Sequence, residues 1–61
     1  MSKLLVDLRD QNGDPTVVVV AHVTHLTVAD SRRTTIHFTG QREIVVEGAI
    51  SEIAAKLWPA Y

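Results

Sequence analysis

Two strand patterns followed by one helix pattern occupy residues 34–58, TTIHFTGQREIVVEGAISEIAAKLW. Residues 34–39 carry a β-branched or aromatic side chain at every second position, and this period of two predicts a strand. A second strand is predicted over residues 43–47, and it shares an apolar face with the first when Ile44 lies opposite Phe38. A short polar turn joins the two strands, so we expect an antiparallel hairpin.

The helix pattern covers residues 49–58. Its apolar side chains recur at the i, i+3, i+4, i+7 spacing of one helix face, namely Ile50, Ile53, Ala54 and Leu57. Gly48 is an acceptable N-terminal cap, and Pro59 ends the pattern. About three turns do not persist alone in water, so we expect this face to dock on the sheet or on a neighbouring subunit.

Two further strands are predicted upstream, over residues 3–9 and 16–28. The Asn-Gly pair at positions 12–13 suits the two central positions of a type I′ hairpin turn. A two-residue loop there places Leu8 opposite Val17 and predicts the register of this hairpin.

The strand over residues 16–28 changes character along its length. Residues 17–20 are four consecutive valines, so this part is apolar on both faces and is either covered on both sides or used as a contact between chains. The buried positions change parity between His22 and His25, which indicates a β-bulge or a bend.

The predicted fold is therefore α+β: a four-stranded antiparallel β-meander followed by one C-terminal helix, in a single domain over residues 1–61. The chain has 61 residues, nine valines and no cysteine. A core this small barely offsets the entropy of ordering the chain, and disulfides are excluded as a supplement. We therefore expect a β-rich homo-oligomer.

Charge and hydropathy exclude several partners. Six Lys and Arg against seven Asp and Glu give a net charge of −1, which provides no overall attraction for nucleic acid or an anionic membrane. The longest apolar run is far shorter than the roughly 20 residues that span a bilayer, and no signal peptide pattern follows Met1. We expect a cytoplasmic protein without membrane contact.

The order of these elements resembles a known family. The residues of this chain that carry the resemblance are Val23-x-x-Leu26, a polar loop, Thr35-Ile36-His37-Phe38-Thr39, Gly40, Ile44-Val45-Val46-Glu47, then Ser51-Glu52-Ile53 at the start of a short helix. This pattern is similar to the small flagellar and swarming motility regulators of the FlbD family, and more remotely to the β-rich DNA-binding domain of LytTR response regulators. The resemblance implies a compact regulator that acts through protein partners or nucleic acid, without catalysis.

A cross-strand histidine pair is the first candidate site. When Leu26 lies opposite Ile36, His25 lies beside His37 on the other face of the sheet. Two imidazoles hold a transition metal only with a third ligand. His22 or a residue of another subunit would have to supply that ligand. A solvent-facing histidine pair without metal is the favoured interpretation, so we predict no metal and no cofactor.

The second candidate is a face of hydroxyl and imidazole groups flanked by two arginines. Guanidinium and hydroxyl donors together suit a phosphate group, although a solvated strand face explains the same pattern. The ligand-binding candidates are His25, Arg32, Arg33, Thr35, His37 and Thr39.

The interface candidates combine the valine run with two aromatic residues near the C-terminus, where aromatic side chains anchor subunit contacts. They are Val17, Val18, Val19, Val20, Trp58 and Tyr61. The three serines lack a nucleophile motif and an evident base, so we expect no catalysis.

These patterns favour a non-enzymatic, oligomeric regulatory or interaction module that acts through a partner protein. The alternative is an oligomer that binds or sequesters a phosphorylated or nucleotide-like small molecule between subunits. Direct DNA binding is a further alternative, which the near-neutral charge disfavours.

Overall fold

The computed structural model describes residues 5–58. It contains two antiparallel sheets and one helix, which confirms the α+β class. Their bounds are β1 (Leu5–Arg9), β2 (Pro15–Val19), the 3₁₀ turn η1 (Val20–His22), β3 (Val23–Asp30), β4 (Arg33–Phe38), β5 (Arg42–Glu47) and α1 (Ile50–Leu57). β1 pairs with β2, and the second sheet has the order β3-β4-β5. The prediction of four strands in one meander is therefore wrong: five strands form two sheets.

The additional strand arises because η1 interrupts the predicted strand over residues 16–28. The backbone N–H of Thr39, in the β4–β5 turn, donates to the carbonyl of His22 at 2.9 Å. This bond holds the end of η1 against the second sheet, and β3 starts at the next residue. The register also shifts between Val23 and His25, at the place where the parity change indicated a bulge.

The first hairpin has a different register from the predicted one. Leu8 lies opposite Thr16 rather than Val17, because the loop has three residues and not two. The Asp10 carboxylate accepts from the N–H groups of Asn12 at 2.9 Å and Asp14 at 3.0 Å, and Gly13 has φ 83°. A type I turn followed by a glycine in this conformation is the usual three-residue hairpin loop.

The second sheet follows the prediction on one side and departs from it on the other. Leu26 lies opposite Ile36 and His25 opposite His37, as predicted. Ile44 lies opposite Ile36 rather than Phe38, because the three-residue turn occupies residues 39–41, one residue earlier than the 40–42 between the predicted strands, with positive φ at Gly40 and Gln41. A shift of two residues keeps every side chain on its predicted face.

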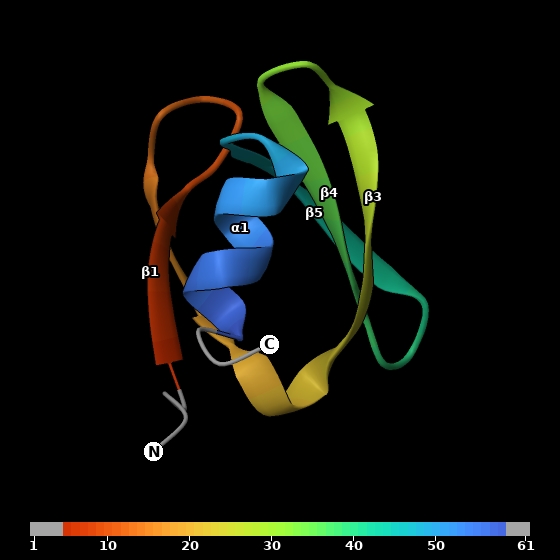
Figure 1. Ribbon diagram of the computed structural model, residues 1–61. Helices are drawn as coiled ribbons and strands as arrows, with labels where there is room; N and C mark the ends of the chain where they lie inside the picture. The colour runs from red at the N-terminus through yellow and green to blue at the C-terminus, as the bar shows by residue number, and fades with distance from the viewer. Residues whose placement is uncertain (1–4, 59–61) are drawn as a thin grey trace.

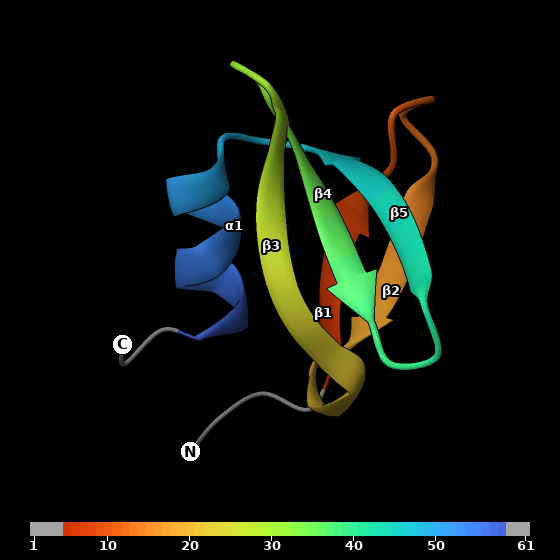
Figure 2. The same cartoon turned by 90° about the vertical axis from the view of Figure 1, so that its right-hand side faces the viewer.

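The sheets and the helix enclose one core. Figures 1 and 2 show α1 beside β3 and β4, with the β1–β2 hairpin on the other side of the helix, and β1 also contacts β5. All three parts contribute to the cluster of buried side chains, which is Val6, Leu8, Val18, Ile36, Val46, Ile53 and Leu57. The hairpin alone has too little apolar surface to be stable, so it depends on this shared core.

The junction between β5 and α1 is fixed by a buried hydroxyl. Thr34 is fully buried, and its Oγ1 donates to the carbonyl of Gly48 at 2.9 Å. Gly48 has φ 123°, and its N–H donates to the carbonyl of Arg32 at 2.7 Å. The helix cap is Ala49, without a side-chain hydrogen bond, so the assignment of Gly48 as the cap is corrected by one residue. Gly48 instead turns the chain from the sheet into the helix.

We predict that Gly48→Ala destabilises the fold more than Gly40→Ala. A methyl group at Gly48 would lie 2.9 Å from Cδ1 of the buried Ile53, whereas at Gly40 it would meet nothing within 4 Å. Backbone strain and overpacking together should cost about 2–4 kcal/mol at Gly48, against about 1–2 kcal/mol of strain at Gly40. Urea unfolding measures both, and equal losses would contradict the packing argument.

Thr34→Val tests the buried hydroxyl. The change keeps the shape of the side chain but leaves the Gly48 carbonyl without this donor, so we expect a loss of about 1–2 kcal/mol in the free energy of unfolding. Thr35→Val is the matched control, because Thr35 is the next residue of β4 and is only half-buried. Equal stability of the two variants would reject the role assigned to Thr34.

Candidate functional site

The second sheet has a polar outer face. Thr34 and Ile36 of β4 are fully buried, so the alternate residues of the strand face outward. The register aligns them in rows across the sheet: His37 lies between His25 and Glu43, and Thr35 lies between Thr27 and Val45. We call this surface the polar face.

The two histidines of the polar face are stacked. Their ring centroids are 4.2 Å apart and the planes differ by 5°. Nε2 of His37 lies 2.8 Å from Oγ1 of Thr27, and its Nδ1 lies 3.6 Å from Oε2 of Glu43. Nδ1 of His25 lies 3.0 Å from Oγ1 of Thr24. The predicted His25–His37 neighbourhood is confirmed, and both rings have hydroxyl partners within the chain.

A third metal ligand does not accompany this pair. Among residues 5–58, no group of three or more His, Asp or Glu side chains is arranged to hold a metal ion. His22, the third ligand considered from the sequence, lies in η1 and lines a different groove. The alternative in which His22 completes a metal site with this pair therefore gains no support from the structure.

The six ligand-binding candidates do not gather at one place. His25, Arg33, Thr35 and His37 share the polar face, while Arg32 lies in the β3–β4 turn and Thr39 in the β4–β5 turn. Nη1 of Arg33 lies 3.5 Å from Oδ2 of Asp30, an ion pair that is about half exposed. Arg33 thus lies on the polar face but is paired with a carboxylate, and Arg32 lies outside this face, so the six candidates do not form a single phosphate cradle.

The valine run divides between the core and the surface. Val18 is 2% exposed and belongs to the chain's own core, which removes it from the interface candidates. Val20 is half-buried in η1 and packs against the core. Val17 and Val19 are 58% and 42% exposed on the other face of β2. The structure therefore leaves two of the four valines available for contact.

Leu5 extends this exposed apolar surface. It lies opposite Val19 in the hairpin and is 57% exposed. We call Leu5, Val17 and Val19 the β2 surface. The sequence pattern does not indicate Leu5 as a surface residue. The predicted register pairs even-numbered residues of the first strand, such as Leu8, with odd-numbered valines, such as Val17, and so places these valines in the core.

A groove runs beside β2. Its apolar walls come from Val17 and Val19 of β2 and from Phe38 and Ile44 of the second sheet, and its ionisable lining residues are His22 and Arg42. We call it the β2 groove. Phe38 was expected in the core, and it is half-buried and packs against the core from the groove. Three separate segments form this groove, so no local pattern predicts it.

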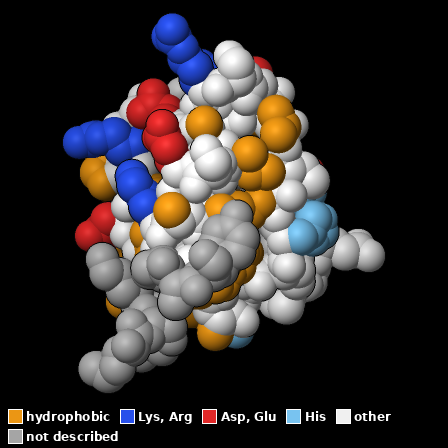
Figure 3. Space-filling view, viewed as in Figure 1, with side chains coloured by type: hydrophobic (Ala, Val, Ile, Leu, Met, Phe, Trp, Pro, Cys, Tyr) orange, Lys and Arg blue, Asp and Glu red, His pale blue; other side chains and the backbone are white. Residues whose placement is uncertain are grey.

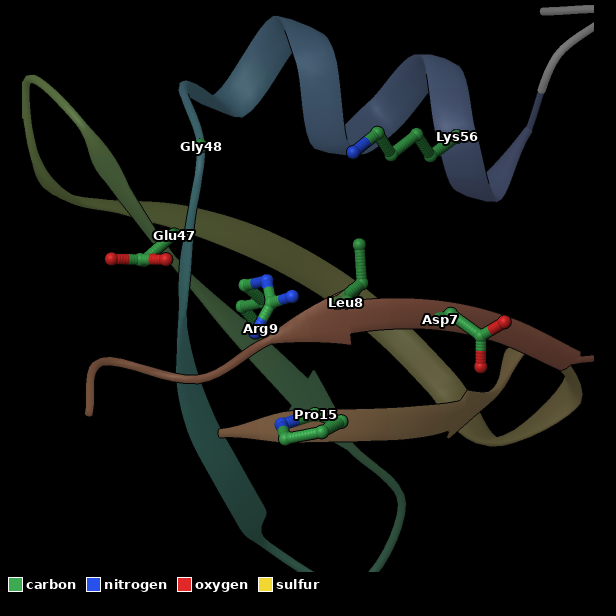
Figure 4. Close-up of a pocket in the computed structure, with 7 residues that line it drawn as sticks. All are labelled: Asp7, Leu8, Arg9, Pro15, Glu47, Gly48 and Lys56. Atoms are coloured by element: carbon green, nitrogen blue, oxygen red, sulfur yellow. The ribbon is translucent and has the colours of Figure 1, made fainter. Parts of the chain in front are cut away.

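A charged cleft lies between the hairpin and the helix. Arg9 and Lys56 line it together with Asp7 and Glu47. In Figure 4, the Arg9 and Lys56 side chains extend from β1 and α1 into the space between these elements, and Nη1 of Arg9 donates to the carbonyl of Gly13 at 2.9 Å. Two cations and two carboxylates balance, so this cleft has no net charge that would attract an anion.

The C-terminal end of α1 carries Trp58. Its side chain is half-buried, packs against the core and lines an apolar depression with Leu26 and Ile50. Figure 3 shows apolar side chains between α1 and β3, while charged side chains lie over β1 and on the adjacent side of α1. Trp58 thus contributes to the core as well as to the surface. The other aromatic interface candidate, Tyr61, lies outside the described residues.

The chain matches no protein-family model, and no curated protein and no solved structure matches it significantly. The resemblance to FlbD-type regulators therefore stays a prediction. No helix within residues 5–58 has the length and apolar character required to cross a membrane.

Proposed function

We propose that this chain is a non-enzymatic interaction module that works as a homo-oligomer and assembles through the β2 surface. The observation that carries the proposal is the exposure of Leu5 of β1 and of Val17 and Val19 of β2, a strand that pairs on one side only among the described residues. Native proteins protect such edges because an unpaired, apolar strand recruits another chain. At β2 we interpret the two exposed valines as part of an assembly surface.

A second copy is the partner that this surface fits best. A two-fold interface uses the same patch on both subunits, so the patch must be complementary to itself. The outward face of β1 places Asp7 opposite Val17 and Arg9 opposite Pro15, so both signs of charge flank the apolar residues. A partner surface of a single charge sign would be repelled by one of these two charged side chains.

The alternatives have weaker support. Binding of a phosphorylated molecule would need free guanidinium donors near the polar face, and Arg33 is engaged with Asp30. DNA binding would need several clustered cations, whereas the described Lys and Arg residues lie in separate strands, turns and the helix. Catalysis by a hydroxyl and a base also needs a concave site that holds a substrate, and the contacts between the histidines and the threonine hydroxyls lie on an exposed sheet face. Regulation through a further protein partner remains part of the proposal.

Val17→Lys tests the assembly surface, with Val28→Lys as the matched control. Both valines are exposed strand residues, 58% and 63% respectively, but Val28 belongs to β3 in the other sheet. Loss of apolar contact and repulsion between lysines should raise the dissociation constant of the oligomer by about tenfold or more for Val17→Lys. Sedimentation analysis over a concentration series measures this constant.

Val28→Lys should leave the assembly unchanged. If both variants assemble as the unmodified chain does, the β2 surface is not the interface. If the unmodified chain sediments as a single subunit at every concentration, self-association itself is rejected.

A further inference from the structure

The hydrogen-bond pattern of the first hairpin determines which backbone groups of β2 are free. The N–H of Asp10 donates to the carbonyl of Asp14 at 3.0 Å, so this pair is hydrogen-bonded across the hairpin. Hydrogen-bonded pairs alternate along an antiparallel ladder. Thr16 and Val18 are therefore directed toward β1, while the N–H and C=O groups of Val17 and Val19 point away from it.

The position of Pro15 is consistent with backbone groups of the odd-numbered β2 residues pointing away from β1. Pro15 lies opposite Arg9 at the start of β2, at a position whose nitrogen also faces away from β1. Proline is tolerated in a sheet where its missing N–H would face an open edge. The edge of β2 thus offers the N–H and C=O groups of two valines and the carbonyl of Pro15.

The other strand edges are less suitable for a second chain. β3 has register shifts between Val23 and His25 and between Val28 and Asp30, and such irregularities twist an edge away from pairing. β5 already meets the first hairpin, because the N–H of Gln11 donates to the carbonyl of Val45 at 3.1 Å. β1 also contacts β5, so within residues 5–58 we take the edge of β2, which lines the β2 groove, as the edge open to a second chain.

From this geometry we infer that two copies join β2 to β2, antiparallel about a two-fold axis at Val17, and this inference rests on the proposed self-association. An axis at Val17 pairs all five residues of β2 (Pro15–Val19), whereas an axis at Thr16 or Val18 pairs three. Val17 of each copy then exchanges two hydrogen bonds with Val17 of the other, and each Val19 N–H donates to the Pro15 carbonyl of the other copy.

The charges at the ends of β2 fit the same register. Asp14 precedes β2 and is exposed, and antiparallel pairing about Val17 places it opposite Val20 of the second copy. His22, two residues after Val20 in the chain, and Arg42 line the β2 groove, and no carboxylate of the described residues lines it. Each copy thus brings one carboxylate toward the groove of the other copy that the Arg42 guanidinium lines, so a dimer has two such contacts.

Single-cysteine variants test the register, because the chain has no cysteine of its own. A hydrogen-bonded antiparallel pair has a Cα–Cα distance of about 5.5 Å, within the range that a disulfide bridges. Val17→Cys should therefore form a covalent dimer on mild oxidation. The two copies of residue 19 would be about 14 Å apart, so Val19→Cys should cross-link at least tenfold more slowly, as should the control Val28→Cys.

A charge exchange provides a second readout that needs no disulfide. Asp14→Lys should raise the dimer dissociation constant several-fold, and adding Arg42→Asp should restore part of the affinity. The register is overturned if Val19→Cys cross-links as fast as Val17→Cys, or if the unmodified chain is a dimer and neither readout responds. A chain that stays a single subunit at every concentration overturns the proposed function as well, so the two failures are distinguishable.

Discussion

The contact between η1 and the second sheet determines the arrangement of this molecule. The hydrogen bond from the N–H of Thr39 to the carbonyl of His22 holds the chain where β2 ends and β3 begins. Because the chain turns there, β2 pairs only with β1 and β3 only with β4 among residues 5–58. The unpaired edge of β2, the exposure of Val17 and Val19 and the groove beside them all follow from this break. A continuous strand through residues 16–28 would have given one meander instead.

Much of the fold follows from sequence periodicity. The apolar face of α1 and the pairing of Leu26 with Ile36 were predictable, because apolar side chains in these segments recur at helix or strand spacing. The hairpin registers were not, because they depend on how Asp10 caps one loop and on where the positive-φ residues Gly40 and Gln41 place the turn of the other. The four valines carry no period, so their division between core and surface is decided by tertiary contacts. The β2 groove could not be predicted for the same reason, because its walls come from three separate segments.

The two surfaces of the chain have opposite characters. On the polar face, threonine hydroxyls and Glu43 lie beside the stacked histidines. At β2, apolar side chains and backbone groups lack partners within the described residues. For a chain of 61 residues, a single core contributes little net stability. Pairing at β2 would bury additional apolar surface and add hydrogen bonds, so assembly and stability are coupled in this account.

Hydrogen–deuterium exchange of individual backbone amides at several protein concentrations tests this account most directly. The N–H groups of Val17 and Val19 lack an acceptor in a single subunit and gain one in the pair. The account predicts that these two amides become protected as the concentration rises, while the amides of Thr16 and Val18, which already bond β1, change much less. Rapid exchange at Val17 and Val19 at all concentrations would contradict the central claim.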